Sequence, residues 1–421
     1  MQIQKIPHAK GIVTVPGDKS ISHRSIMLAS LASGTSEIRG FLKGADCLST
    51  IDCFRRLGVC IEEKGDAIVV HGNGLYGLKQ PDDTLYTGNS GTTTRLLCGI
   101  LAAQKFGCTI TGDESIQKRP MKRVTLPLSQ MGAQIEGEYC PLHIHGTSLH
   151  GITYDMPVAS AQVKTAILLA GLYADGATVI NETDRSRDHT ERMLAAMGAD
   201  IRTDGLQVCI STANSLSPQK IDVAGDISSA AFFLVLGAIL PGSELTLQNV
   251  NINETRTGIL DVMQEMGAKL KIEHIRVHSG EPMADITVSH SSLKAVTIGG
   301  SLIPRLIDEI PAISVLALFA KGSTVIRDAQ ELKVKETNRI RAVVDEWTKC
   351  GARVTETEDG MVIEGGNPLH SADFLSYGDH RMAMSEAVLA QCVDGVSSID
   401  DCKCVDISYP GFFDTLYALG R

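Results

Sequence analysis

The chain has 421 residues, of which 43% are apolar, and it is longer than the size at which a single hydrophobic core stops growing. We therefore expect two domains, each with its own core. The formal net charge of −10 argues against nonspecific binding to nucleic acid or to an anionic membrane, because both attract positively charged proteins. Any site for an anion must then be local.

Residues 1–17 alternate polar and apolar side chains and lack the apolar centre of a secretory leader. No run of about eighteen apolar residues follows. We therefore predict a cytoplasmic protein without a membrane span. The eleven cysteines include no CxxC pair, and their odd number favours reduced thiols over a disulfide framework.

One pattern recurs along the chain: a polar start, a helix of small apolar residues, a glycine and a short β-rich segment. The starts are spaced by about seventy residues, with one longer gap, which is typical of structural duplication. The six copies of this first helix begin near Ser22, Thr92, Ser160, Ser228, Ile310 and His380.

A second helix in each unit precedes a repeated glycine, which we interpret as its C-terminal cap. Two alternating segments with a turn between them follow, as in residues 61–70 and 201–210, and predict a hairpin. Each unit then holds a helix, a strand, a second helix and two further strands. The capping glycines are Gly58, Gly132, Gly198, Gly267 and Gly351.

The sixth second helix ends at Gly420, so its two strands are missing from the C-terminal end. Residues 3–6 and 11–15 form the same kind of strand pair, and we expect them to supply these strands. This predicts a discontinuous domain of residues 1–17 plus 225–421 and an inserted domain of residues 18–224, each with three units. A hinge is expected near residues 15–19 and 222–227.

Polar residues mark the start of the first helix in every unit. Unpaired amide donors and the positive dipole end make a helix start favourable for anions. Two threefold arrangements of units facing each other would bring these starts to one cleft. Ordinary N-capping remains an open alternative for the serines, which are Ser20, Ser90, Ser160 and Ser228.

Three cations lie near the starts of first helices, and four more fall at the starts of second helices. Cations at a helix start oppose the helix dipole, and this local cost indicates an anionic ligand. Two carboxylates accompany them: Asp308, in an apolar context, and Glu336, which a helical stretch would put within a turn of two cations. They are candidates for a general base and a general acid, with an N-cap and a surface ion pair as the open alternatives. The cations are Lys19, Arg24, Arg119, Arg187, Lys335, Arg339 and Arg381.

Two other motifs are weaker evidence for function. The sequence GDKS ends like a nucleotide P-loop, but the required glycine spacing before Lys19 is absent. His143 and His145 share one face of a strand without further ligands, so no metal site is predicted.

The motifs taken together closely resemble the 5-enolpyruvylshikimate-3-phosphate synthase family, and the resemblance covers the whole chain. It implies a two-domain, inside-out α/β barrel of six βαβαββ-type units, three per domain. It also implies ligand-driven closure, no metal and no organic cofactor. The motifs are PGDKSISHR, GNSGTTTRL, KRPMKRV, SAQVKTAILLAG, SRDHTERM, LIDEIPAI, KVKETNRI and YGDHRMAM.

The family reaction moves the enolpyruvyl group of phosphoenolpyruvate to the 5-hydroxyl of shikimate 3-phosphate, a step of chorismate and aromatic amino-acid biosynthesis. By motif match, the shikimate 3-phosphate ligands are Lys19, Ser20, Arg24, Ser160, Gln162, Arg187, Asp308 and Lys335. The phosphoenolpyruvate ligands are Lys19, Gly91, Arg119, Gln162, Arg339 and Arg381, with Asn89, Ser90 and His380 lining the same region.

The chemistry follows from the substrate. The enol carbon becomes electrophilic only when the methylene group is protonated, so an acid must act while the 5-hydroxyl loses its proton. Glu336 is the candidate acid. The base is Asp308 or Lys19, and the sequence leaves that choice open. The resulting tetrahedral intermediate then expels phosphate.

The chain departs from some members of the family. Residues 404–408 lack a lysine that those members carry near the C-terminus, and Lys403 is an untested substitute. Ala161 replaces the second serine of a pair, which leaves Ser160 as the contact. Gly91 beside phosphoenolpyruvate predicts sensitivity to the herbicide glyphosate.

Three competing interpretations remain. The sister transferase that acts on UDP-N-acetylglucosamine uses a loop cysteine, whereas the corresponding residues 112–124 hold Arg119 and no cysteine. A nucleic-acid-end binding or cyclase module is disfavoured by the net charge and by an aromatic content of 4%. The third is a binding-only paralogue. The expected partners are two small substrates, and a monomer is expected.

Overall fold

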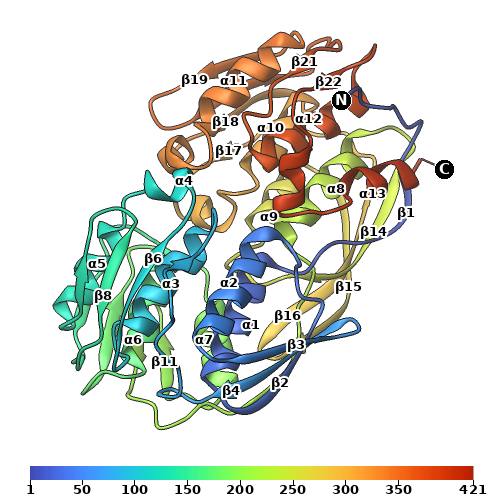
Figure 1. Ribbon diagram of the computed structural model, residues 1–421. Helices are drawn as coiled ribbons and strands as arrows, with labels where there is room; N and C mark the ends of the chain where they lie inside the picture. The colour runs from blue at the N-terminus through green and yellow to red at the C-terminus, as the bar shows by residue number, and fades with distance from the viewer. Residues whose placement is uncertain (421) are drawn as a thin grey trace. The chain divides into compact units, whose positions relative to one another are not determined.

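The computed structural model describes residues 1–420, which divide into two compact units (Figure 1). The discontinuous unit comprises Met1–Pro16, Gly225–Arg276 and the chain from Pro282 onward. The inserted unit comprises Gly17–Ala224 and Val277–Glu281. The predicted inserted domain differs from this unit by Gly17 and by the short segment Val277–Glu281. None of the helices in residues 1–420 has the length and apolar character needed to cross a membrane.

The inserted unit contains three four-stranded sheets. The first has the order β13 (Lys220–Asp222), β2 (Ser33–Arg39), β4 (Ala67–Asn73), β3 (Cys60–Lys64). The second has the order β5 (Leu85–Tyr86), β6 (Gly107–Thr111), β8 (Leu142–His145), β7 (Gln134–Glu136). The third has the order β9 (Thr153–Asp155), β10 (Thr178–Asn181), β12 (Gln207–Ile210), β11 (Ile201–Asp204). The helices are α1 (Lys19–Leu31), α2 (Ala45–Arg56), α3 (Gly91–Leu101), α4 (Glu114–Gln117), α5 (Lys122–Gln130), α6 (Ala161–Gly171) and α7 (His189–Ala196).

The discontinuous unit contains two four-stranded sheets and one pair of strands. The first sheet has the order β1 (Lys10–Thr14), β14 (Glu244–Asn251), β16 (Glu281–Ser289), β15 (Lys269–His278). The second has the order β17 (Thr297–Ile298), β18 (Gly322–Ile326), β20 (Met361–Gly365), β19 (Arg353–Glu356), and the pair is β21 (Asp373–Phe374) with β22 (Ser398–Ile399). The α-helices are α8 (Ile227–Ile239), α9 (Gly258–Glu265), α10 (Ile310–Leu318), α11 (Arg339–Lys349), α12 (His380–Cys392) and α13 (Phe412–Ala418). Short 3₁₀ turns are η1 (Gly300–Arg305), η2 (Gln330–Val334) and η3 (Lys403–Ile407).

The sheets share one plan, in which the first strand runs parallel to the second. In β5–α3–β6, β9–α6–β10, β17–α10–β18 and β21–α12–β22 the first helix joins this parallel pair. Parallel neighbours need such a crossover because a tight turn can join only antiparallel strands. The predicted hairpins after the second helices are confirmed, since β3 and β11 pair antiparallel with β4 and β12.

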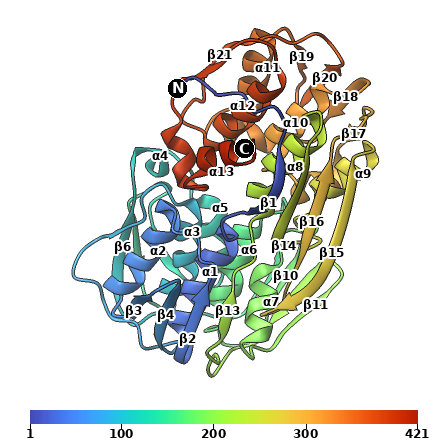
Figure 2. The same cartoon turned by 90° about the vertical axis from the view of Figure 1, so that its right-hand side faces the viewer.

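The remaining two parallel pairs form where the chain passes between units. In each of them, the first strand pairs in one unit, while the helix that follows it in the chain belongs to the other unit. Strand β1 precedes α1 of the inserted unit but pairs with β14, and β13 precedes α8 but pairs with β2. The two views agree on β1 beside β14 (Figures 1 and 2). The prediction that residues 11–15 complete the sixth unit is therefore wrong: they complete the fourth.

The other predicted N-terminal strand, residues 3–6, does not form. Gln2 instead makes one antiparallel bridge to Ser398 of β22, and the Ile3 N–H donates to the Ser397 carbonyl at 2.9 Å. A strand forms only where a partner strand lies beside it, and that partner comes from far away in the sequence. The local alternation of these residues therefore did not decide whether they form a strand.

The first helices begin within one residue of their predicted starts, except α1, which begins at Lys19, three residues before Ser22. These helices form the interior of each unit. Every residue of α8 is buried, as is every residue of α1 from Ile21 to Leu31. Within the discontinuous unit α8, α10 and α12 pack against one another. Interior helices make the hydrophobic contacts, so only their polar starts are left for other roles.

The repeated glycines end the second helices as predicted. Their φ angles, from 86° to 97°, lie in the left-handed region that residues with a Cβ rarely adopt. All eleven cysteines lie in the described part of the chain and are free thiols.

Candidate active site

The first helices of the inserted unit, and α8 of the discontinuous unit, begin with side-chain caps, but not all at the predicted residues. Ser90 caps α3 and Ser160 caps α6. The cap of α1 is Asp18, whose carboxylate accepts from the Ile21 N–H at 2.9 Å, and the cap of α8 is Asp226. N-capping by Ser20 or Ser228 is therefore wrong. Each lies one or two residues inside its helix, where its hydroxyl is not needed to cap the helix.

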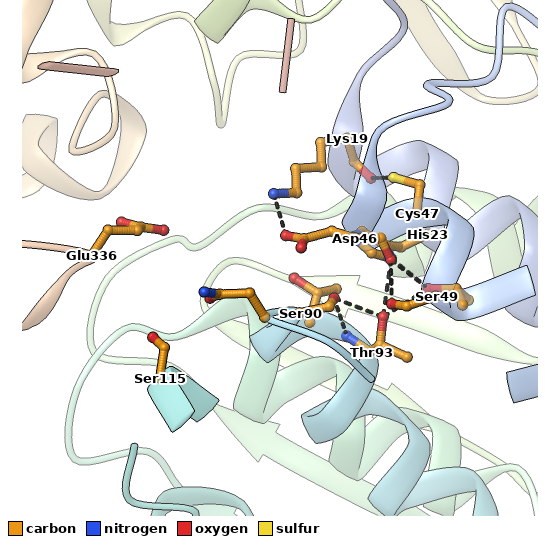
Figure 3. Close-up of polar contacts among 12 residues, drawn as sticks. Lys19, His23, Asp46, Cys47, Ser49, Ser90, Thr93, Ser115 and Glu336 are labelled. Atoms are coloured by element: carbon orange, nitrogen blue, oxygen red, sulfur yellow. Dashed lines mark hydrogen bonds and ion pairs between the residues drawn. The ribbon is translucent and has the colours of Figure 1, made fainter. Parts of the chain in front are cut away.

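Lys19 is the first residue of α1, and its ammonium forms an ion pair with Asp46 of α2 (Figure 3). The Lys19 side chain keeps 23% of its surface exposed. Asp46 therefore holds the ammonium in place at the helix start while leaving it accessible. Ser20 follows and is half-buried.

Arg24 lies in the second turn of α1 and is buried. Its guanidinium donates to Thr190 at 2.7 Å, to Thr165 at 2.8 Å and to the Ser20 carbonyl at 3.0 Å. All three partners are neutral. Burial lowers the pKa of Arg24 to about 10, so this side chain remains a cation at neutral pH.

Two arginines lie beside the start of α3. Gly91 is its first residue, and a Cβ atom there would lie 2.8 Å from Arg95 Nη1 and 3.5 Å from Arg119 Nη1. Arg95 donates to the Gln162 amide oxygen at 2.7 Å, and Gln162 Nε2 donates to Thr92 at 3.1 Å. The glycine thus gives two guanidinium groups room beside the helix start.

Arg119 lies between α4 and α5 rather than within a helix. Its guanidinium donates to Asn89 at 2.9 Å and to Ser115 at 3.2 Å. Asn89 in turn donates to Asp113 at 3.0 Å. Arg119 is therefore positioned by neutral oxygens, as Arg24 is.

Arg187 is half-buried and stands directly before Asp188, the residue that precedes α7. Its neighbour Ser186 is buried. The structure thus places Lys19, Ser20, Arg24, Ser90, Gly91, Arg119, Ser160, Gln162 and Arg187 in or directly before the helix starts of one unit, apart from Arg24, which lies one turn further on.

In the discontinuous unit, Asp308 is not an N-cap, because Glu309 occupies that position of α10 without a capping bond. The Asp308 carboxylate lies 3.4 Å from Lys335 Nζ and 3.5 Å from Arg339 Nη1. Its backbone carbonyl accepts from Arg381 at 3.0 Å. One aspartate therefore joins three of the predicted cations.

Arg339 is the centre of this cluster and its side chain is 1% exposed. It contacts Asp379 at 2.8 Å and Glu336 at 2.7 Å, in addition to Asp308. Burial alone lowers the pKa of the Arg339 guanidinium, but Asp379 and Glu336 outweigh it and raise that pKa above its ordinary value. Asp379 also caps α12.

Glu336 lies between η2 and α11, so the predicted helical stretch is absent. The contact with Arg339 arises from an irregular segment instead. Burial raises the pKa of the Glu336 carboxyl, but Arg339, His380 and Lys335 together lower it well below its usual range. In the absence of substrate Glu336 is therefore ionised at neutral pH.

His380 and Arg381 are the first two residues of α12. His380 is buried, whereas Arg381 is half-buried. Lys403, the suggested substitute for a C-terminal lysine, is exposed at the start of η3.

Sequence reasoning missed three residues that hold the predicted ones: Asp46, Arg95 and Asp379. Arg95 and Asp379 lie inside the motifs GNSGTTTRL and YGDHRMAM, so the motifs themselves signalled them. Asp46 lies outside all motifs, and only its contact with Lys19 reveals it.

Among residues 1–420, one group has the residue types of a metal site: Cys60, Glu62 and His71 on β3 and β4. The Lys64 ammonium lies 2.6 Å from the Glu62 carboxylate, so this carboxylate is already paired with a cation of the protein. His143 and His145 do not belong to such a group.

The sequence and the fold were compared with known proteins. The family model described as EPSP synthase (3-phosphoshikimate 1-carboxyvinyltransferase) matches residues 3–416. A relative of that name from Geobacillus kaustophilus is 56% identical over 97% of both chains, and one from Brevibacillus brevis is 53% identical over 100% of both. The structure of EPSP synthase from Acinetobacter baumannii has a TM-score of 0.91 and 45% identity, and the match covers 100% of this chain and 98% of that one. The chain therefore belongs to the EPSP synthase family.

Proposed function

We propose that this chain transfers the enolpyruvyl group of phosphoenolpyruvate to the 5-hydroxyl of shikimate 3-phosphate, releasing phosphate. The match of the family model to residues 3–416 carries the proposal. The motifs of both units support the proposal, because in each unit the predicted ligands lie at or near helix starts. The family matched is not the UDP-N-acetylglucosamine transferase, and no cysteine occurs in residues 112–124.

Shikimate 3-phosphate is proposed to bind Lys19, Ser20 and Arg24 of α1, residues near the starts of α6 and α7, and Asp308 and Lys335 of the discontinuous unit. Guanidinium groups held by neutral oxygens keep their full charge available for phosphate. Arg24 meets this condition. The start of α6 contributes Ser160 and Gln162, and the segment before α7 contributes Arg187.

Phosphoenolpyruvate is proposed to bind Lys19, Gly91, Arg119 and Gln162 of the inserted unit and Arg339 and Arg381 of the discontinuous unit. Asn89, Ser90 and His380 are proposed to line the same place. The absence of a Cβ at Gly91 supports this, since two arginines approach that position. A carboxylate and a phosphate group suit such paired guanidiniums.

Asp308 is proposed as the base that takes the 5-hydroxyl proton. An ammonium in an ion pair has no lone pair with which to accept a proton, and Lys19 is paired with Asp46. This favours Asp308 over Lys19. Lys19 then serves as a cation that stabilises the developing negative charge.

Glu336 is proposed as the acid that protonates the methylene carbon. Its lowered pKa means that it must gain a proton when the substrates bind. Phosphoenolpyruvate brings negative charge to Arg339 and weakens the hold of this cation on Glu336, so the pKa of Glu336 rises on binding. Exclusion of water strengthens these interactions.

We further infer that each unit is an inside-out α/β barrel, that ligands close the two units about the predicted hinge, and that the protein is a cytoplasmic monomer. The burial of the first helices inside each unit supports the barrel. Sedimentation measurements test the monomer, and small-angle scattering with and without shikimate 3-phosphate tests closure.

Phosphate release by the purified protein tests the function. Release should require both substrates, so each is omitted in turn as a control. Release with UDP-N-acetylglucosamine in place of shikimate 3-phosphate would instead assign the sister reaction. A folded protein that binds both substrates without releasing phosphate would be a binding-only paralogue.

A further inference from the structure

A group of three buried charges in the inserted unit is not used by the mechanism above. Lys164 of α6 has a side-chain exposure of 1%, and its ammonium lies 2.8 Å from Glu182 and 2.6 Å from Glu191. The carboxylate side chains are 3% and 7% exposed. Burying such ions is costly because they lose their hydration, and apolar replacements are often as stable or more so. Stability alone is therefore a poor explanation for this triad.

The triad also fixes the backbone of the segment that precedes α7. Glu182 Oε1 accepts from the Ser186 N–H at 3.2 Å and from the Ser186 hydroxyl. Lys164 Nζ donates to the Ser186 carbonyl at 3.4 Å. Both backbone polar groups of Ser186 thus bond to charged side chains. The segment from residue 182 to 188 has no regular secondary structure that would fix it otherwise.

Arg187 follows Ser186 directly, so its backbone position depends on these bonds. A guanidinium that binds phosphate must be held to within a fraction of an ångström to make two hydrogen bonds. The triad bonds to both the N–H and the carbonyl of Ser186, the residue next to Arg187.

The triad also joins the helices that carry the other predicted phosphate ligands. Thr165 follows Lys164, Thr190 precedes Glu191, and their hydroxyls lie 2.7 Å apart. Both hydroxyls accept from Arg24. The Lys164 N–H donates to the Ser160 carbonyl at 3.0 Å, so the same turn of α6 continues to the helix start.

We propose that Lys164, Glu182 and Glu191 are positioning residues for the phosphate group of shikimate 3-phosphate, and that they act through Arg187 without touching the substrate. This inference rests on the proposed function. Removing the ammonium breaks the bond to the Ser186 carbonyl and leaves the buried Glu182 carboxylate without its cation. We expect this to misplace the Arg187 guanidinium by about an ångström, which typically costs tenfold to hundredfold.

The variant Lys164→Met keeps the length of the side chain and removes its charge. We expect the KM for shikimate 3-phosphate to rise about tenfold or more, with kcat and the KM for phosphoenolpyruvate changed less than about threefold. Lys43→Met removes an exposed lysine of the same unit and should change none of these values. Glu182→Gln is isosteric and should shift the same KM in the same direction, and it decides the question if Lys164→Met does not fold.

A double-mutant cycle separates positioning from a merely structural role. In an Arg187→Ala background, Lys164→Met should raise the KM for shikimate 3-phosphate by less than about twofold. An unchanged KM in the single variants, or a full additional effect in the Arg187→Ala background, would overturn the positioning role. Wild-type turnover is measured first, and its absence would overturn the proposed function instead.

Discussion

The cations of the two units differ in what holds them. In the inserted unit Arg24, Arg95 and Arg119 donate to hydroxyl, amide and carbonyl oxygens, which are neutral. In the discontinuous unit Arg339 contacts three carboxylates. A cation held by neutral oxygens keeps its charge for a ligand, whereas one held by carboxylates mainly fixes those carboxylates and shifts their pKa values.

This difference suggests a division of labour. Changes in the inserted unit should act on substrate affinity, and changes to the carboxylates of the discontinuous unit should act on turnover. Two cations are exceptions: Lys19 of the inserted unit is paired with Asp46, and Arg381 of the discontinuous unit donates to the neutral carbonyl of Asp308. The predictions below test the division, beginning with the largest expected effect.

The change Asp308→Asn should lower kcat by about a thousandfold, because the amide cannot accept the 5-hydroxyl proton. The amide is nearly isosteric, so circular dichroism and the KM values should change little. Stopped assays of phosphate release measure the loss. Asp345→Asn, on the exposed face of α11, serves as the control. Near-normal kcat in the purified variant would remove Asp308 from the mechanism.

The change Glu336→Gln should lower kcat by about a hundredfold or more, since the amide has no proton of suitable acidity to donate. Because the pKa of Glu336 is lowered in the free protein, formation of the reactive complex should take up a proton. Calorimetry with a non-reacting analogue of phosphoenolpyruvate, in buffers of different ionisation enthalpy, measures that uptake. Equal proton uptake by wild type and variant would rule out Glu336 as the acid.

The change Gly91→Ala should raise the KM for phosphoenolpyruvate by roughly tenfold, because the new methyl group pushes Arg95 from its position. The wild type should be inhibited by glyphosate, and the variant should need a higher concentration. The KM for shikimate 3-phosphate is the internal control. An inhibition curve of the wild type that stays flat to millimolar glyphosate would contradict the assignment of Gly91.

The smallest effect concerns stability. His23 is buried in α1 with Nδ1 2.7 Å from the Thr50 hydroxyl, and burial together with Lys19 lowers its pKa from 6.5 to about 3. The folded protein therefore keeps His23 neutral where the unfolded chain is protonated. The stability from this residue is complete above pH 6.5 and falls by about 1.4 kcal/mol per pH unit below it.

Urea unfolding of wild type and His23→Gln at pH 7 and pH 5 measures this contribution. The free energy of unfolding should fall more between these pH values in the wild type than in the variant. A parallel fall in both proteins would show that other groups control the acid sensitivity. Unfolding is measured without turnover, so this prediction tests the packing of His23 and not the division of labour between the two units.

Much of the candidate site was predictable because its signals are local. A helix start, its capping residue and a cation within the next few residues all lie in one short stretch of sequence. What could not be predicted is which oxygen holds each cation. Arg339 meets Asp379 and Arg95 meets Gln162 only because helices far apart in the sequence pack together.

The sequence by itself predicted the recurring helix pattern, five of the first-helix starts to within one residue, the glycines that end the second helices and the family to which the motifs belong. These depend on periodicity and on backbone conformations that only certain residues adopt. Only the tertiary structure decided that β1 joins β14 and β13 joins β2, and that Asp18 and Asp226 rather than serines cap their helices. It also decided which cations lower the pKa of Glu336. Strand partners and electrostatic neighbours are set by long-range packing, for which the local pattern carries no signal.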